Sequence, residues 1–296
     1  TRYYGDYCAV DDISFELSTG DILGFLGPNG AGKSTTMQIL SGNLAPSEGA
    51  IAINGVDLLD KPGQAKAALG YLPEVPPLYK DMSVDEYLSY CAKLRRINKA
   101  GITGAMALAK QRCGLEDVGK RLIGNLSKGF QQRVGIAQAI LHSPEVIILD
   151  EPTVGLDPIQ IREIRELIIE LGKSHGIILS THILPEVESV CNRVQIINAG
   201  RLVYASDMQG LLAHQTTGKF EIALGNPPSI EALRATDVID AVEQQDANHF
   251  VVDISTSADI LAAAAVNNNW QLRKLAPVER SLEHIFVNLT LGDEAG

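Results

Sequence analysis

A glycine-rich run near the start of the chain has the residue types and spacing needed to hold phosphate groups. Residues 27–35 read Gly-Pro-Asn-Gly-Ala-Gly-Lys-Ser-Thr, which fits the phosphate-loop pattern G-x-x-x-x-G-K-[ST]. The glycines allow successive backbone N–H groups to turn inward and bind an anion. Lys33 adds a positive charge for the β- and γ-phosphates, and the Ser34 hydroxyl can ligand Mg²⁺. The run therefore predicts a site for a nucleoside triphosphate.

Two adjacent carboxylates follow an apolar strand and could act on a metal ion and on water. The residues 146–149 are continuously apolar, as in central parallel strands, and Asp150 and Glu151 follow them. In a chain with a phosphate loop, Asp150 is placed for Mg²⁺ and Glu151 for polarising the attacking water. His182 ends a second such strand and could contact a γ-phosphate, although an isolated loop histidine is more often simply solvated.

The segments around the glycine-rich run supply the structural context that the motif requires. The residues 22–26 form an apolar run typical of a buried strand, and residues 36–40 have helical spacing. A helix that begins near Ser34 directs its positive dipole end at the phosphates. With both flanks present, we favour nucleotide binding over a simple glycine-rich turn.

The rest of the first two thirds predicts an α/β domain with a helical insertion. Strands are expected at 13–17 and 50–53. Strand signals are scarce between 74 and 125, where helical spacing prevails. We therefore expect a helical subdomain at about 74–140.

The C-terminal third predicts a smaller α+β unit. A change of composition near 213–218 indicates a linker. The segments after it follow the order β-α-β-β-α-β-α, which suggests a ferredoxin-like arrangement. The apolar run 261–265 is interpreted as a packed helix, and no residue of this unit is a catalytic candidate.

Composition and charge limit the function classes. The chain has 296 residues, is 45% hydrophobic and carries a net charge of −11, which suits a globular protein but not a broad nucleic-acid-binding surface. It has no run of eighteen apolar residues and no signal-peptide pattern, so we expect neither a transmembrane helix nor secretion. Its four cysteines lack C-x-x-C spacing, so we expect reduced thiols in the cytoplasm.

Five motifs occur in one order along residues 1–212. They are the phosphate loop, a Leu-Ser-x-Gly helix start at 126–129, the Asp-Glu strand end, a Gly-Leu-Asp loop at 155–157 and His182. In this combination the chain resembles the nucleotide-binding subunits of ABC transporters. The resemblance implies a P-loop NTPase fold in residues 1–214, with a mainly parallel sheet, an antiparallel N-terminal β subdomain and a helical insertion. Residues 218–296 would form the small α+β domain.

The resemblance also implies roles for individual residues. Glu151, His182 and Lys33 would be catalytic, and Tyr4 would stack on adenine, although an N-terminal tyrosine is more often packed in a core. The signature residues Ser127 and Gly129 would contact the γ-phosphate bound to a second subunit. The implied ATP-binding residues are Tyr4, Asn29, Gly30, Ala31, Gly32, Lys33, Ser34, Thr35, Glu74, Ser127, Gly129 and Asp157, with Ser34, Glu74 and Asp150 at Mg²⁺.

One position departs from the family pattern. The family usually has glutamine where this chain has Glu74. A carboxylate is also an oxygen ligand for Mg²⁺, but it adds negative charge near the γ-phosphate. Glu74, the following Pro76-Pro77 and the Leu-Ser-Lys-Gly-Phe signature resemble the branch paired with type-2 permeases. Members of that branch mostly export lipids, drugs or polysaccharides, or serve gliding and metal-related systems.

The implied partners are ATP, a second ATP-binding subunit and an integral membrane permease. One phosphate loop and one signature per chain require two chains, identical or paralogous, at the inner face of the cell membrane. The alternative is a soluble ABC-type ATPase acting on nucleic acid or ribosomes. Such proteins typically add coiled-coil, zinc or second-cassette segments, which are not visible here, and we expect no nucleic-acid partner. A non-hydrolysing regulatory subunit is disfavoured by the intact Asp150, Glu151 and His182.

Overall fold

The computed structural model describes residues 1–208, 219–236, 238–254, 257–278 and 282–291. The chain divides into two units, of which the first comprises Thr1–Met208 together with residues from Leu289 onward, and the second lies within 209–288. The linker expected at 213–218 lies outside the described residues. Within the described ranges, no helix is both long and apolar enough to cross a lipid bilayer.

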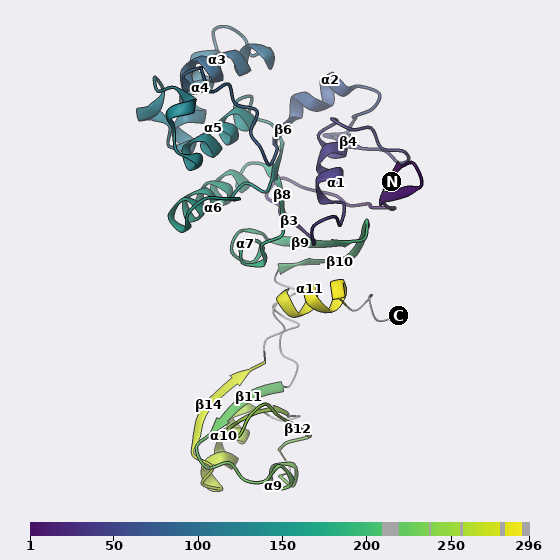
Figure 1. Ribbon diagram of the computed structural model, residues 1–296, viewed down its shortest axis with the longest axis vertical. Helices are drawn as coiled ribbons and strands as arrows, with labels where there is room; N and C mark the ends of the chain where they lie inside the picture. The colour runs from purple at the N-terminus through teal and green to yellow at the C-terminus, as the bar shows by residue number, and fades with distance from the viewer. Residues whose placement is uncertain (209–218, 237, 255–256, 279–281, 292–296) are drawn as a thin grey trace. The chain divides into compact units, whose positions relative to one another are not determined.

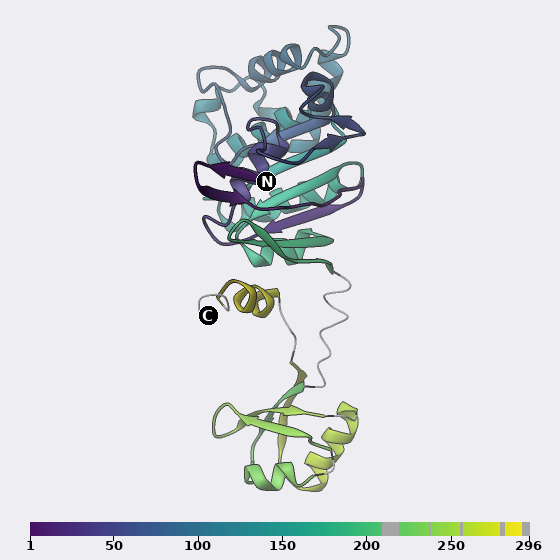
Figure 2. The same ribbon diagram turned by 90° about the vertical axis from the view of Figure 1, so that its right-hand side faces the viewer.

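The first unit is built on a six-stranded, mainly parallel sheet (Figures 1 and 2). Its strand order is β10-β9-β3-β8-β7-β6, and β10 runs antiparallel to β9 at one edge. The strand β3 is apolar along its whole length, and β7 and β8 are mainly apolar before their polar carboxyl ends, because both faces of these strands are buried. The strands are β3 (Ile22–Leu26), β6 (Leu69–Leu72), β7 (Val146–Asp150), β8 (Gly176–Thr181), β9 (Arg193–Asn198) and β10 (Arg201–Asp207).

Helices cover both faces of this sheet (Figure 1). The helix α1 packs on the face that carries Phe25 and Ile148, and its Met37 joins the same core. The helix α7 packs on the other face, where a Cβ at Gly24 would lie only 2.7 Å from the Val187 side chain. Glycine at this point of β3 therefore permits the close approach of α7. The helices are α1 (Lys33–Leu40), α6 (Pro158–Gly172) and α7 (Leu184–Val190).

The N-terminal β subdomain is smaller than the sequence indicates. The segment 13–17 was expected to be a strand but joins no ladder, and only the second half of 50–53 is strand. The alternation of Ile13, Phe15 and Leu17 reflects burial, since these side chains pack on the core beside α1. The elements here are the antiparallel pairs β1 (Arg2–Tyr4) with β2 (Tyr7–Val10) and β4 (Ala52–Ile53) with β5 (Val56–Asp57), followed by α2 (Pro62–Ala65) and the 3₁₀ helix η1 (Lys66–Ala68).

A helical insertion connects β6 to the neighbouring parallel strand β7. Its first helix begins with a capping box, in which Ser83 and Glu86 each satisfy a backbone N–H of the other. Its last helix ends tightly against β6, where a Cβ at Gly70 would overlap the carbonyl oxygen of Ala139. The elements are α3 (Val84–Leu94), α4 (Ile102–Cys113), η2 (Glu116–Val118), η3 (Ile123–Asn125) and α5 (Lys128–Ile140).

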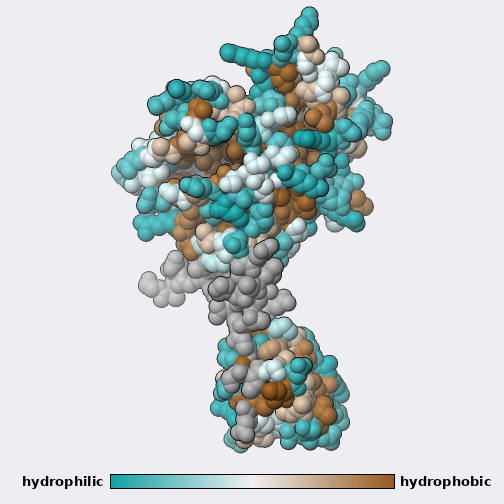
Figure 3. All heavy atoms as spheres, turned by 180° about the vertical axis from the view of Figure 1, so that it is seen from behind, coloured by the Kyte–Doolittle hydropathy of each residue, from teal (hydrophilic) through white to brown (hydrophobic). Residues whose placement is uncertain are grey.

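The second unit has the ferredoxin-like order of elements. Its antiparallel sheet runs β12-β13-β11-β14, so the first and third strands of the unit lie at the centre. Phe250, Leu261 and Trp270 are buried in its core, and Leu261 places α10 against the sheet as the sequence indicates. The elements are β11 (Lys219–Leu224), α9 (Ile230–Arg234), β12 (Ala241–Gln244), β13 (His249–Asp253), α10 (Ala258–Asn267) and β14 (Leu272–Pro277), and α11 (Leu282–Leu291) follows them. The predicted fold class is thus confirmed. Figure 3 shows one face of the molecule, on which hydrophilic and hydrophobic residues are mixed.

Candidate functional site

The phosphate-loop run connects β3 to α1, as its flanking sequence predicts. Gly30 and Gly32 have φ angles of 82° and 107°, in the left-handed region that suits glycine. Gly32 is the N-cap residue of α1, and the helix begins at Lys33. The loop therefore places backbone N–H groups and the positive end of a helix dipole at one point, which is the geometry of an anion site.

Lys33 lies inside this loop. Its Nζ donates hydrogen bonds to the carbonyl oxygens of Gly27 at 2.7 Å and Pro28 at 3.1 Å. Burial lowers the pKa of Lys33, whereas the charges of Glu151, Asp150 and Glu74 oppose this shift. These three carboxylates thus lie close enough to interact with the lysine, and all four candidate residues belong to one site.

The end of β7 holds two buried carboxylates. Asp150 pairs in register with Ser180 of β8, and its Oδ1 is buried without a hydrogen-bond partner. Burial raises the pKa of Asp150, and the charges of Glu151 and Glu74 raise it further, while Ser180 and Lys33 act in the opposite direction. An unpaired buried oxygen and a raised pKa are features expected of a carboxylate that can bind a cation.

Glu151 and His182 form a pair across the ends of β7 and β8. The Glu151 Oε1 lies 2.9 Å from the His182 Nδ1, and the Glu151 Oε2 is buried without a partner. Glu151 has a φ of 48°, which is rare for a residue with a side chain, and its N–H donates to the Ser180 carbonyl oxygen at 2.9 Å. Such strained backbone often marks a functional site. The side chain of His182 remains 46% exposed, so the pair faces solvent through the histidine.

The signature residues and the Gly-Leu-Asp loop form a second group. Ser127 caps α5 by accepting a hydrogen bond from the Phe130 N–H. Asp157 caps α6 by accepting from two backbone N–H groups, and a Cβ at Gly129 would lie 2.6 Å from the Gln160 side chain of that helix. The two helix starts are therefore neighbours. Ser127 and Asp157 thus each have a structural role as a helix cap.

Two further candidates have exposed side chains. Tyr4 is exposed on β1, and the guanidinium of Arg2 lies 4.9 Å from the centre of its ring. Its ring is thus available for stacking rather than packed in a core. Glu74 lies two residues after the end of β6, is exposed, and is close enough for its charge to affect Lys33 and Asp150.

Sequence reasoning missed a buried hydrogen-bonded group behind the Glu151–His182 pair. Glu186 of α7 accepts hydrogen bonds from the hydroxyls of Thr153 and Thr181, and all three residues are buried. Nothing in the sequence marked Glu186, which reads as an ordinary acidic residue in the first turn of a helix.

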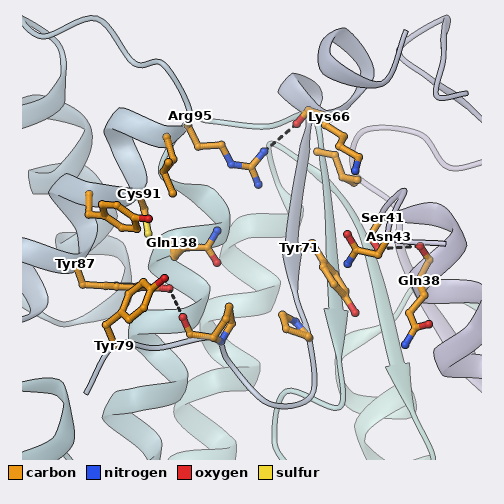
Figure 4. A pocket seen from close by; sticks show the side chains of 15 residues that line it. Gln38, Ser41, Asn43, Lys66, Tyr71, Tyr79, Tyr87, Cys91, Arg95 and Gln138 are labelled. Carbon is orange, nitrogen blue, oxygen red and sulfur yellow. Dashed lines mark hydrogen bonds between the residues drawn. The ribbon is translucent and has the colours of Figure 1, made fainter. Parts of the chain in front are cut away.

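Sequence reasoning also missed a groove between α3 and the β6 side of the first unit (Figure 4). It has a volume of about 840 Å³, and Tyr90 is among the residues that line it. Tyr79 and Tyr87 lie on the side opposite Tyr71 of β6 (Figure 4). Arg95 closes one end by donating to the Lys66 carbonyl oxygen at 3.0 Å. Burial, with a smaller effect of Asp150, raises the pKa of Tyr71 to about 12, so Tyr71 is a neutral donor at ordinary pH.

Comparisons with known proteins agree with this geometry. Residues 10–154 match the family described as ABC transporter. The chain is 36% identical over 299 residues to the bacitracin transport ATP-binding protein BcrA of Bacillus licheniformis, covering all of this chain and 97% of that protein. It is 31% identical to the linearmycin resistance ATP-binding protein LnrL of Bacillus subtilis, covering 98% and 96% of the two chains. A solved structure described as an ATP binding subunit of an ABC transporter is similar with a TM-score of 0.65 and 33% identity, over 72% of this chain and 89% of that one.

Proposed function

Because this chain belongs to the ATP-binding subunits of ABC transporters, an ATPase family that drives separate membrane permeases, we propose how its residues carry out the reaction. The Glu151–His182 pair beside the phosphate loop carries the proposal. Glu151 acts as the general base that polarises the attacking water, and His182 orients this carboxylate and contacts the γ-phosphate. Lys33 and the loop N–H groups bind the β- and γ-phosphates.

The oxygens near Lys33 fit Mg²⁺. The Asp150 Oδ1 is buried and unpaired, and hydroxyl and carboxylate oxygens are the ligands that Mg²⁺ prefers. We assign the binding of Mg²⁺ to Ser34, Asp150 and Glu74. The ion would neutralise part of the charge of the phosphates at this site. No cluster of three or more His, Cys, Asp or Glu side chains arranged to hold a metal is found among the described residues.

The remaining ATP contacts come from a second subunit. Ser127, Gly129 and Asp157 form their own group at the starts of α5 and α6, and this group would face the phosphate loop of the partner. Two ATP molecules would then lie between two head-to-tail subunits. The test is activity against protein concentration, because a composite site loses turnover on dilution.

The groove beside α3 suits the permease. Tyr79, Tyr90 and Leu94 expose 53%, 37% and 64% of their surface there, close to the segment that carries Glu74. A short amphipathic helix of the permease would bury these side chains and so couple membrane movements to the ATP site. We expect Tyr90→Arg to abolish co-purification with the permease from detergent-solubilised membranes. The control is Leu108→Arg, at an exposed position of α4 outside the groove. Unchanged co-purification of Tyr90→Arg would place the permease elsewhere.

The names of two relatives support a proposal for the cargo and the cellular position. BcrA is named for bacitracin transport and LnrL for linearmycin resistance, so we propose export of an antibiotic by a complex at the inner face of the cell membrane. Loss of the gene should increase sensitivity to the exported compound, and unchanged sensitivity across a panel of antibiotics that includes bacitracin and linearmycin would argue against this cargo class. We assign residues 1–214 to ATP binding and 218–296 to an accessory domain of the dimer.

A further inference from the structure

Glu186 is a buried carboxylate with an unusual set of partners. Only 1% of its surface is exposed, and its two oxygens accept hydrogen bonds from two different threonines. The Thr181 Oγ1 donates to Oε2 at 2.8 Å, and the Thr153 Oγ1 donates to Oε1. No lysine or arginine of the described residues forms an ion pair with Glu186. Because a buried polar group is costly unless it is hydrogen-bonded, the two hydroxyls supply the partners that this carboxyl group requires.

The two threonines are next to the proposed catalytic pair in the chain. Thr153 is two residues after Glu151, and Thr181 immediately precedes His182. The contact of 2.9 Å between Glu151 and His182 closes a ring that runs through Thr153, Glu186 and Thr181 and back to the pair. Glu186 of α7 thus links the carboxyl ends of β7 and β8 through its hydrogen bonds with the two threonines.

The backbone around His182 is fixed by the same group. The Ile183 N–H donates to the Thr181 Oγ1 at 3.1 Å, while the hydroxyl hydrogen of Thr181 is directed at Glu186. The residues on both sides of His182 therefore depend on the orientation of one hydroxyl group. Loss of Glu186 would free that hydroxyl and, with it, the direction in which His182 meets Glu151.

We propose that Glu186 is a positioning residue for ATP hydrolysis, which holds the Glu151–His182 pair in its working geometry through Thr153 and Thr181. The proposal rests on the roles assigned above to Glu151 and His182. We do not expect Glu186 to contribute to ATP binding. Its helix α7 covers one face of the sheet, whereas α1, which follows the phosphate loop, covers the opposite face.

The test compares Glu186→Leu, Glu186→Gln and Glu188→Leu in the full chain, with Glu188 as the exposed neighbour on α7. For Glu186→Leu we expect kcat to fall by at least about tenfold while KM for ATP stays within about threefold, since misplacement of catalytic groups lowers turnover. Slow hydrolysis should also make this variant accumulate as an ATP-bound dimer in size-exclusion chromatography. Glu186→Gln keeps a hydrogen-bond acceptor and should recover most of kcat, and Glu188→Leu should match the wild type. A wild-type kcat in folded Glu186→Leu would overturn the proposal.

A second pair of variants decides the question if Glu186→Leu does not fold. Thr153→Val and Thr181→Val remove one hydroxyl each at nearly constant shape, and each should lower kcat without raising KM. Wild-type kcat in both would refute the role of Glu186. Glu151→Gln, measured beside them, distinguishes an error in the proposed function from an error in the positioning role of Glu186. If it retains turnover, the assignment of the pair is wrong, whereas an inactive Glu151→Gln with fully active threonine variants would refute the positioning role alone.

Discussion

Replacement of Glu151 by glutamine should stop turnover and leave ATP binding intact. Glutamine has nearly the same shape and keeps an oxygen that His182 can reach at the present 2.9 Å, so the site should not collapse. It cannot, however, accept a proton from water. General-base catalysis contributes about 10²–10⁴-fold to enzymatic rates, which corresponds to about 3–5 kcal/mol in the activation barrier. We therefore expect kcat to fall by at least about 100-fold.

The assay is phosphate release under saturating ATP, with ATP affinity measured separately by titration calorimetry. Glu166→Gln is the matched control, because Glu166 is an exposed glutamate that pairs with Arg162 one turn away on α6. Its activity should equal that of the wild type. The general-base assignment fails if Glu151→Gln hydrolyses ATP within about threefold of the wild-type rate.

Three further outcomes are expected. Lys33→Ala should lose measurable ATP binding in calorimetry, because the buried ammonium is the charge placed at the phosphates, and retained affinity would contradict the phosphate-loop assignment. The ATPase rate per protein molecule should fall on dilution below the dimer dissociation constant, and a constant rate for a demonstrated monomer would contradict the composite site. Burial and the charge of Arg95 lower the pKa of His142 to about 4, so the unfolded state binds a proton that the folded state excludes. The free energy of unfolding should therefore fall by up to about 3 kcal/mol as the pH falls from about 6.5 to 4. In urea unfolding, His142→Gln should reduce this pH dependence. An unchanged dependence would contradict the burial argument.

The features that the sequence predicts best are those set by local rules. The phosphate loop needs glycine at left-handed positions, and the central strands need apolar residues on both faces, so Gly32 and the runs at 22–26 and 146–149 can be recognised without a structure. The segment 13–17 shows the limit of this reasoning. Its alternation correctly indicates a buried face, but alternation does not reveal whether a neighbouring strand is present to form hydrogen bonds.

Features that depend on distant parts of the chain could not be predicted. Glu186 is meaningful only because the fold brings Thr153 and Thr181 to it from two other segments. The groove of Figure 4 likewise combines α1, β6 and α3, whose tyrosines read in the sequence as ordinary helix residues. The assignments of Ser127, Gly129 and Asp157 to ATP remain predictions, since the contacts that they make here are those of helix caps and close packing.

The close approach of Gly70 and Ala139 has a mechanical consequence. No methyl group fits between β6 and the last turn of α5, so this end of the helix is a pivot fixed to the sheet. The thirteen residues of α5 span about 20 Å at 1.5 Å per residue, and Ser127 lies at the far end of that lever. A rotation of about 10° about the pivot would carry Ser127 by about 3 Å, which is the length of one hydrogen bond. A small angular movement at the sheet is therefore enough to make or break a contact at the other end.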